Sequence, residues 1–432
     1  MKINTLTGVS IVIANMVGTG AFTSLGFQLV DLKNPNVVLT LWVMGGVLAI
    51  SGAFSYAEVG TVIKKSGGEY AFLSQTYNPL IGYLSGWISL SVGFAAPIAL
   101  SAIAFVEYFP IKNIPVNLIG ILLIAIVTYI HTRNLKTSSK FQNISTFLKV
   151  GLILVFIAIG SIYPSSIINS DTIVKTEFFS ELFSPAFAVA LIYVSYSYSG
   201  WNAAAYTTEE FSNPRKSLPI ALVGGTLLVM VLYTLLQFVF LKHVPIEELK
   251  GQLNVGTLAA QHILGNGGGT FFSAAISLLL ISGISAMVWV GSRVSSSIAN
   301  DYKLWSYLRT DADGIPRKAL WLQCIVSSAI LLTGTFEQIL VYCGVLLSIS
   351  SMLVVFAVFK IRKKSFLIKN NGYKSPLFPF FQILFLLLSL WMIIFAFISH
   401  TTETIAGMGN LLIGIITYLL GKKFEKTKRE EV

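Results

Sequence analysis

Two short stretches combine residue types that could bind a small zwitterion. Asn15 to Gly20 and Tyr196 to Asn202 each place glycine and small polar residues inside an otherwise apolar segment. Glycine costs about 1 kcal/mol relative to alanine inside a helix, so each stretch predicts a break. Backbone N–H groups from Gly20 onward would bind a carboxylate, and unpaired carbonyls before each break would bind an ammonium. Together they would hold the two charged groups of an α-amino acid.

The segments that carry these stretches are typical of membrane helices. The 432 residues are 54% hydrophobic and 11% charged, where soluble domains carry about 25% charged residues. Mean hydropathy is +0.76. Continuously apolar runs of about 20 residues, enough to cross a bilayer, repeat along the chain. We therefore predict an all-α polytopic membrane protein with about twelve transmembrane helices, and the unbroken apolar runs exclude a β-barrel. The expected spans lie near residues 8–30, 37–63, 79–108, 114–131, 141–163, 182–208, 217–241, 267–299, 319–335, 338–360, 377–399 and 401–421.

The distribution of Lys and Arg predicts the orientation. With the N-terminus inside, the outer loops carry only Lys33, Lys112, Lys175, Lys242 and Lys250. One further lysine lies within a span, and all the others fall on the cytoplasmic side. The positive-inside rule then places both termini in the cytoplasm. It also accounts for the net charge of +11 without a nucleic-acid partner. We expect an integral protein of a bacterial inner (plasma) membrane, with a basic tail at 422–432 on anionic lipid headgroups.

The two predicted breaks fall in the first and the sixth span, which are corresponding places in two runs of five. Interrupted helices at matched positions are typical of transporters built from inverted repeats, with a binding site near the membrane midplane. Irregular backbone at that depth is stable only where it is packed or lines a cavity. Close packing of small residues between helices is the alternative explanation for either break alone.

Several motifs resemble those of a known superfamily. "GTGAF" at Gly18–Phe22, "YAEVG" at Tyr56–Gly60 with "SGGEY" at Ser66–Tyr70, and "SGWNAAAYTTEEFSNPRKSLP" at Ser199–Pro219 occur in this order. They resemble the first-, second- and sixth-helix motifs of the amino acid–polyamine–organocation (APC) superfamily. The sixth-helix motif looks most like the L-type amino acid transporter branch. The resemblance covers nearly the whole chain.

The resemblance implies a LeuT-like fold and secondary active transport by alternating access. One five-helix repeat would cover 7–163, a second, inverted repeat 182–361, and two additional helices 376–421. The amides of Thr19 and Gly20 match groups that hold the substrate carboxylate. The residues whose carbonyls match the amine ligands are Met16, Tyr196 and Ser199, and Tyr196 also matches an aromatic gate. The other residues expected at the substrate site are Asn15, Gly18, Ser197, Gly200, Trp201 and Asn202.

Lys149 lies within the fifth span, where a cation is expensive and functional by default. The alternative is that its long side chain reaches water at the cytoplasmic end. The resemblance implies that the lysine replaces the cation of sodium-coupled relatives, which makes transport sodium-independent. It would then tie the first break to the eighth span, with Ser282 and Ser285 as partners. Burial disfavours a charged lysine, so Lys149 is also a candidate carrier of a coupling proton.

Few acidic residues lie inside the expected spans, and none of them is expected at the depth of the cavity. They are Glu58, Glu107, Glu209 and Glu210. Some superfamily antiporters for basic substrates have Glu where this chain has Asn202, whereas Asn15 matches those antiporters. The balance predicts neutral amino acids as substrates. The alternative is an exchanger of basic amino acids or polyamines.

Glu209, Glu210 and Arg293 are candidates for a cytoplasmic gate, because ion pairs at helix ends form and break at little cost. The alternative interpretation is a solvated helix end without a gating role.

Other classes of protein fit the sequence less well. No span carries paired Asp, a Ser–His pair or a metal-ligating His pair, so we expect no enzymatic activity, no metal and no cofactor. A channel would need a polar filter or pore. The histidines His131, His243, His262 and His400 are expected in loops or at interfaces. Cys324 and Cys343 are expected as small apolar fillers. We expect no cleavable signal peptide, and the sequence indicates no oligomeric state.

Overall fold

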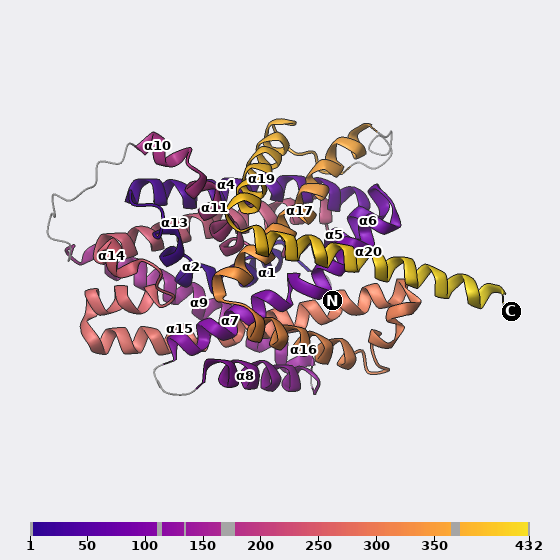
Figure 1. Ribbon diagram of the computed structural model, residues 1–432, viewed down its shortest axis with the longest axis horizontal. Helices are drawn as coiled ribbons and strands as arrows, with labels where there is room; N and C mark the ends of the chain where they lie inside the picture. Colours follow the sequence, from indigo (N-terminus) through magenta and orange to yellow (C-terminus); the bar gives the residue numbers. More distant parts are fainter. Residues whose placement is uncertain (1–2, 110–114, 134, 166–177, 364–371, 431–432) are drawn as a thin grey trace.

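The computed structural model describes residues 3–109, 115–133, 135–165, 178–363 and 372–430, with only the backbone described for 135–143 and 424–430. Within these ranges the regular structure is helical, with one isolated bridge between Ile3 and Phe211 and turns or irregular segments between the helices. The longer helices run roughly along the horizontal axis of Figure 1. The segment around α1 lies in the middle of the molecule, with α8 at one edge and α19 towards the other.

Eight helical stretches are long and apolar enough to cross a membrane. They are α4 (Pro35–Ile63), α6–η1–α7 (Pro79–Tyr108), the part of α9 (Leu135–Ile162) from Ile144, α12–η3–α13 (Pro214–His243), α15 (Val255–Asp301), α17 (Phe336–Lys363), α19 (Phe380–Ser399) and α20 (Thr401–Glu430) as far as Lys423. The described connecting segments contain the short helices α5 (Gly68–Thr76), α10 (Phe178–Leu182), α14 (Ile246–Leu249) and η4 (Lys303–Leu308).

The other four expected spans are short or broken. The first consists of α1 (Thr5–Met16), α2 (Gly20–Thr23) and α3 (Leu25–Gln28), and the sixth of α11 (Pro185–Ser197) and the 3-10 helix η2 (Ala203–Glu210). The fourth is α8 (Val116–His131) and the ninth α16 (Arg317–Thr333). Each predicted span therefore coincides with helical structure. The inverted-repeat relationship and the orientation in the membrane stay predictions.

Two local features differ from the sequence-based expectation. A helical segment from Val255 precedes the eighth span within α15: the backbone breaks at Gly265, where φ is 73° and ψ is −177°, and the helix after this break begins close to residue 267, as predicted. Two single-turn π-helices also interrupt otherwise regular spans, η1 (Ser89–Gly93) in the third and η3 (Ile220–Gly224) in the seventh. Such turns often occur at functional sites, and hydropathy does not reveal them.

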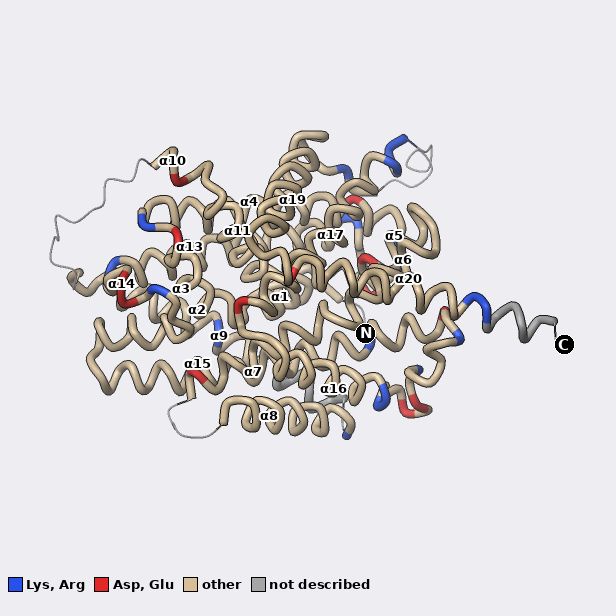
Figure 2. The backbone as a smooth tube through the Cα atoms, in the orientation of Figure 1, with Lys and Arg blue, Asp and Glu red and all other residues tan. Residues whose placement is uncertain are grey.

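The surface suits a lipid environment. The outer helices expose large apolar side chains, for example Leu122 and Ile126 on α8 and Leu387 on α19. Most Lys and Arg segments lie in the half of the molecule towards which α20 extends (Figure 2), in line with an uneven charge distribution. Several basic residues of the charge analysis lie outside the described residues or side chains. They are Lys2, Lys112, Lys136, Lys140, Lys175, Lys364, Lys369, Lys426, Lys428 and Arg429.

Candidate functional site

The structure confirms both helix breaks and brings them into contact. Helix α1 ends at Met16 and α2 begins at Gly20, while α11 ends at Ser197 and η2 begins at Ala203. Gly200 has a φ of 97°, and a Cβ on it would lie 2.7 Å from the carbonyl carbon of Asn15. A Cβ on Gly20 would lie 2.5 Å from the Cα of Ser197. The glycines therefore allow the two interrupted backbones to touch, which a larger residue would prevent.

The first break leaves backbone donors without partners. The N–H groups of Phe22 and Thr23 donate to the carbonyl of Thr19, at 2.9 and 3.1 Å. The N–H groups of Thr19 and Gly20 form no hydrogen bond with the described part of the chain. These are the two amides that the sequence assigns to the substrate carboxylate, and an unpaired N–H at this depth needs an acceptor.

The predicted amine ligands are partly occupied. The Met16 carbonyl accepts the hydroxyl of Tyr233 at 2.6 Å, and the Tyr196 carbonyl accepts the N–H of Ser199 at 2.8 Å. A carbonyl oxygen can accept two hydrogen bonds, so each keeps one site for an ammonium. The Ser199 carbonyl accepts no bond from the described residues.

Ser197 lines the smaller cavity, and its hydroxyl already has two partners within the protein. Its hydroxyl donates to the carbonyl of Tyr193 at 2.9 Å and lies 2.9 Å from the hydroxyl of Ser24. The side chain therefore joins α11 to the first span beside the break, and it has little capacity left for a substrate.

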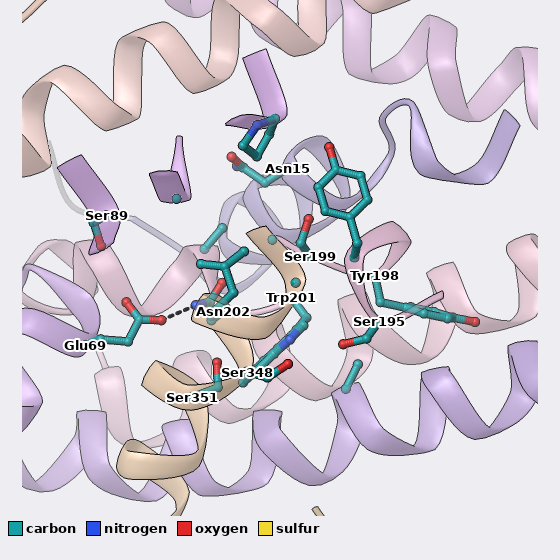
Figure 3. Close-up of a pocket in the computed structure, with 18 of the residues that line it drawn as sticks. Asn15, Glu69, Ser89, Ser195, Tyr198, Ser199, Trp201, Asn202, Ser348 and Ser351 are labelled. Atoms are coloured by element: carbon teal, nitrogen blue, oxygen red, sulfur yellow. Dashed lines mark hydrogen bonds between the residues drawn. The ribbon is translucent and has the colours of Figure 1, made fainter. Parts of the chain in front are cut away.

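Two adjoining cavities lie at the breaks. The smaller is lined by Asn15 to Gly20, together with Gly283 and Ala286 of α15. The larger is lined by Ser199 to Asn202 and by residues of η1 and α17, and it extends away from the first break (Figure 3). The residues shared by both cavities are Asn15, Pro97, Tyr196, Ser199 and Met287. Every substrate-site residue expected from the sequence lines one cavity or both.

Glu69 is the main site residue that the sequence analysis missed. It lies in the first turn of α5, is 5% exposed and lines the larger cavity. Its carboxylate accepts hydrogen bonds from the hydroxyl of Tyr56 at 2.9 Å, the hydroxyl of Tyr206 and the side-chain amide of Asn202. The four acidic residues inside the spans line neither cavity, as expected, and Glu69 supplies an acid at the depth of the cavity from outside the spans. Only acids inside the spans were considered, and α5 lies between two of them; the "SGGEY" motif was the available signal.

The sequence analysis also missed small residues on regular helices. Ser89 and Gly93 of the π-helix η1 line the larger cavity, as do Ser348 and Ser351 of α17. Serine within an apolar segment is common, so no sequence signal distinguished these residues from packing positions.

Lys149 is buried beside the first break. It is 3% exposed, and its Nζ forms no hydrogen bond with the described residues. A Cβ on Gly283 would lie 3.6 Å from this Nζ, and Gly283 lines the smaller cavity. The alternative in which the lysine reaches water is therefore wrong in this structure. Ser282 is also buried without a partner, whereas Ser285 bonds to Nε2 of His131 at 2.8 Å rather than to the lysine.

Arg293 and the two glutamates are not in direct ion-pair contact in this structure, and their gating role stays a prediction. The guanidinium of Arg293 lies over the ring of Trp289 at 4.1 Å and makes no ion pair with Glu209 or Glu210. The two glutamates instead use their backbones: the N–H of Glu209 donates to Ser66, and the carbonyl of Glu210 accepts from Ile3.

Two of the four histidines are core residues rather than loop or interface residues. His131 is 5% exposed, and His243 is fully buried, with its Nε2 at 2.7 Å from the carbonyl of Gly160. Hydropathy placed them at segment ends because it does not show which neighbouring helix covers a polar side chain. In the described part of the chain, no three His, Cys, Asp or Glu residues are placed to hold a metal ion.

The comparison with known families decides the identity of the chain. A family model described as amino acid permease matches residues 3–420. The chain belongs to this amino acid permease family. The permease is 26% identical to the serine/threonine exchanger SteT of Bacillus subtilis (strain 168), over 89% of this chain and 88% of that protein. It is 25% identical to the Asc-type amino acid transporter 1 of Mus musculus, over 97% of this chain and 81% of that protein.

A third relative shares a shorter region. The cystine/glutamate transporter of Homo sapiens is 30% identical to this permease over 65% of the chain, and the match spans only 56% of that relative. The family and the apolar helices together support an integral membrane protein of the amino acid permease family.

Proposed function

We propose that this permease is a secondary active amino acid transporter that works by alternating access and holds its substrate where the two helix breaks meet. The observation that carries the proposal is the contact between the breaks, which line joined cavities. The N–H groups of Thr19 and Gly20 bind the carboxylate. The carbonyls of Ser199, Met16 and Tyr196 bind the ammonium, and the Tyr196 ring closes the cavity as a gate. Because no described atom satisfies these amides, a substrate carboxylate is a fitting acceptor.

The coupling is proposed to be independent of sodium. We infer that the Lys149 ammonium takes the place of a coupling cation, because its Nζ lies beside Gly283 of α15, which lines the smaller cavity together with the first break. Its unpartnered state in this structure suits a group that loses or gains a proton during the cycle. One relative is named as an exchanger. Exchange of one amino acid for another would use the same site equally well.

The prediction of a neutral substrate side chain depended on the absence of an acid at the depth of the cavity. Glu69 lines the larger cavity, so that reason no longer holds. A specific observation therefore favours the second candidate, transport or exchange of basic amino acids. Polyamines lack a carboxylate and would leave the amides of Thr19 and Gly20 unpaired, so we set them aside.

Uptake into proteoliposomes tests the transport function. The purified permease should take up labelled amino acid in a saturable way, and replacing sodium with choline should not change the rate. A bound substrate should also raise the melting temperature of the protein in detergent, because a ligand that binds only the folded state stabilises it. Absence of both uptake and stabilisation across all amino acids would contradict the proposal.

Lys149→Ala tests the coupling role. Removing the ammonium should lower uptake by about tenfold or more, since a cation that bridges helices cannot be replaced by a methyl group. The variant should also lose any response to an imposed pH gradient. Lys303→Ala, at an exposed position, is the matched control and should behave like the unmodified protein. Normal uptake by Lys149→Ala at every pH would rule out this role.

A further inference from the structure

We propose that the carboxylate of Glu69 selects amino acids whose side chain carries a positive charge, and that it binds this charge at the far end of the larger cavity. The inference rests on the proposed transport function and adds to it a substrate class and a selecting residue.

Glu69 lies where a substrate side chain would end. The backbone groups proposed to bind the amino and carboxyl groups of the substrate surround the smaller cavity, and Asn15 and Ser199 connect it to the larger one. In Figure 3, Glu69 lies beyond Asn202 as seen from Asn15. A side chain that extends from the first break past Ser199 therefore leads towards the carboxylate.

Within the part of the chain that the structure describes, Glu69 forms no ion pair with a basic residue. Its three donors, the hydroxyls of Tyr56 and Tyr206 and the amide of Asn202, are all neutral. Among the described residues, no Lys or Arg lines either cavity. A buried carboxylate without a counter-charge is costly, and inside a membrane protein such a group usually belongs to a substrate or ion path. An ammonium or guanidinium in the cavity would supply the missing charge.

Lys149 and Glu69, two buried residues of opposite charge, lie beside different cavities of the joined pair. Lys149 lies beside Gly283, which lines the smaller cavity, and Glu69 lines the larger one. The smaller cavity is the one proposed for the substrate carboxylate. The larger cavity then matches a cationic side chain, so a basic amino acid would complement both cavities.

The carboxylate also keeps the capacity to bind such a side chain. An ionised carboxylate offers about four lone-pair sites, and three hydrogen bonds are formed to Glu69. Trp201 and Phe94 line the same cavity and present ring surfaces to the methylene groups of a long side chain. Hydrogen bonds between charged partners are about twice as strong as those between neutral ones, so the charged substrate should be preferred over a neutral one of equal size.

The test compares pairs of amino acids that differ mainly in charge. Competition with uptake of a labelled substrate in proteoliposomes should show that arginine binds more tightly than citrulline, and lysine more tightly than norleucine. Glu69→Gln keeps the size of the side chain and removes the charge. It should weaken arginine and lysine by about tenfold or more, while citrulline and norleucine change by less than about threefold.

Two further variants separate charge from shape. Glu69→Asp keeps the charge and should retain part of the preference for arginine. Glu107→Gln makes the same chemical change at an exposed position on α7 and should leave all four affinities unchanged. Size-exclusion profiles and melting temperatures show whether each variant is folded.

The experiment distinguishes a failure of the inference about Glu69 from a failure of the proposed transport function. If the unmodified permease transports amino acids but does not prefer arginine over citrulline or lysine over norleucine, the inference is wrong whatever the variants do. It is equally wrong if Glu69→Gln folds and keeps the full preference. If no amino acid is transported or bound at all, the proposed function itself fails.

Discussion

Gly20→Ala should abolish amino acid uptake by this permease. A Cβ at this position would lie 2.5 Å from both the Cα and the Oγ of Ser197, so the two interrupted backbones would have to move apart. The unpaired N–H groups of Thr19 and Gly20 would move with them, and a displacement of about 1 Å at a binding site can cost about 100-fold in rate. Proteoliposome uptake should therefore fall by about that factor or more.

The same substitution should also lower stability, because overpacking costs about 1–3 kcal/mol. The matched control is Gly224→Ala in the seventh span, where a Cβ would meet no atom within 4 Å. That variant should transport and melt like the unmodified protein. Uptake by Gly20→Ala at the normal rate would show that the contact between the breaks is not needed for the substrate.

Arg362→Ala should produce the largest loss of stability among single substitutions away from the cavities. Arg362 in the last turn of α17 donates from Nε and Nη2 to the two carboxylate oxygens of Glu58, at 2.6 and 2.7 Å. The side chain of Glu58 is completely buried on α4. Removing the guanidinium leaves an unpaired buried charge, which costs about 3–5 kcal/mol. Thermal unfolding in detergent measures the effect.

Two comparisons identify the cause of that loss. Arg317→Ala breaks pairs with Asp311 and Asp313 that are more than a third exposed, and it should cost at most about 1 kcal/mol. The double variant Glu58→Gln with Arg362→Met removes both charges and should recover much of the lost stability, because the penalty comes from the isolated carboxylate. An Arg362→Ala protein as stable as Arg317→Ala would contradict this account.

Local sequence features were sufficient to predict the elements. Hydrophobic runs predicted where the spans lie because a membrane helix must be apolar over its whole length. Glycine with small polar neighbours predicted where the first and sixth spans break. The π-helix η1 and the extra helical segment before Gly265 could not be predicted, since both depend on how neighbouring helices pack rather than on the apolar content of the segment.

The contacts between distant segments were predictable only in part. The sequence placed Lys149 near the eighth span through a family resemblance, and the structure shows its Nζ against Gly283 there. It could not show that Ser285 bonds to His131 instead, because the choice between two partners depends on which face of α15 each one meets. Arg293 lies over the ring of Trp289, four residues earlier on α15, which is a local contact within one helix. Its role in a gate with a glutamate stays a prediction.

The sequence by itself determined that this chain is a membrane-embedded helical protein with two interrupted helices suited to an amino acid, because these properties depend on residue types that are close in the chain. Only the tertiary structure decided that Gly200 lies against Asn15 and that Glu69, from the short helix α5 outside the spans, lines the cavity. A side chain acts at a site through its position in space. The folding of α5 against α4 and the sixth span, which no local pattern encodes, puts a carboxylate where hydropathy predicted none.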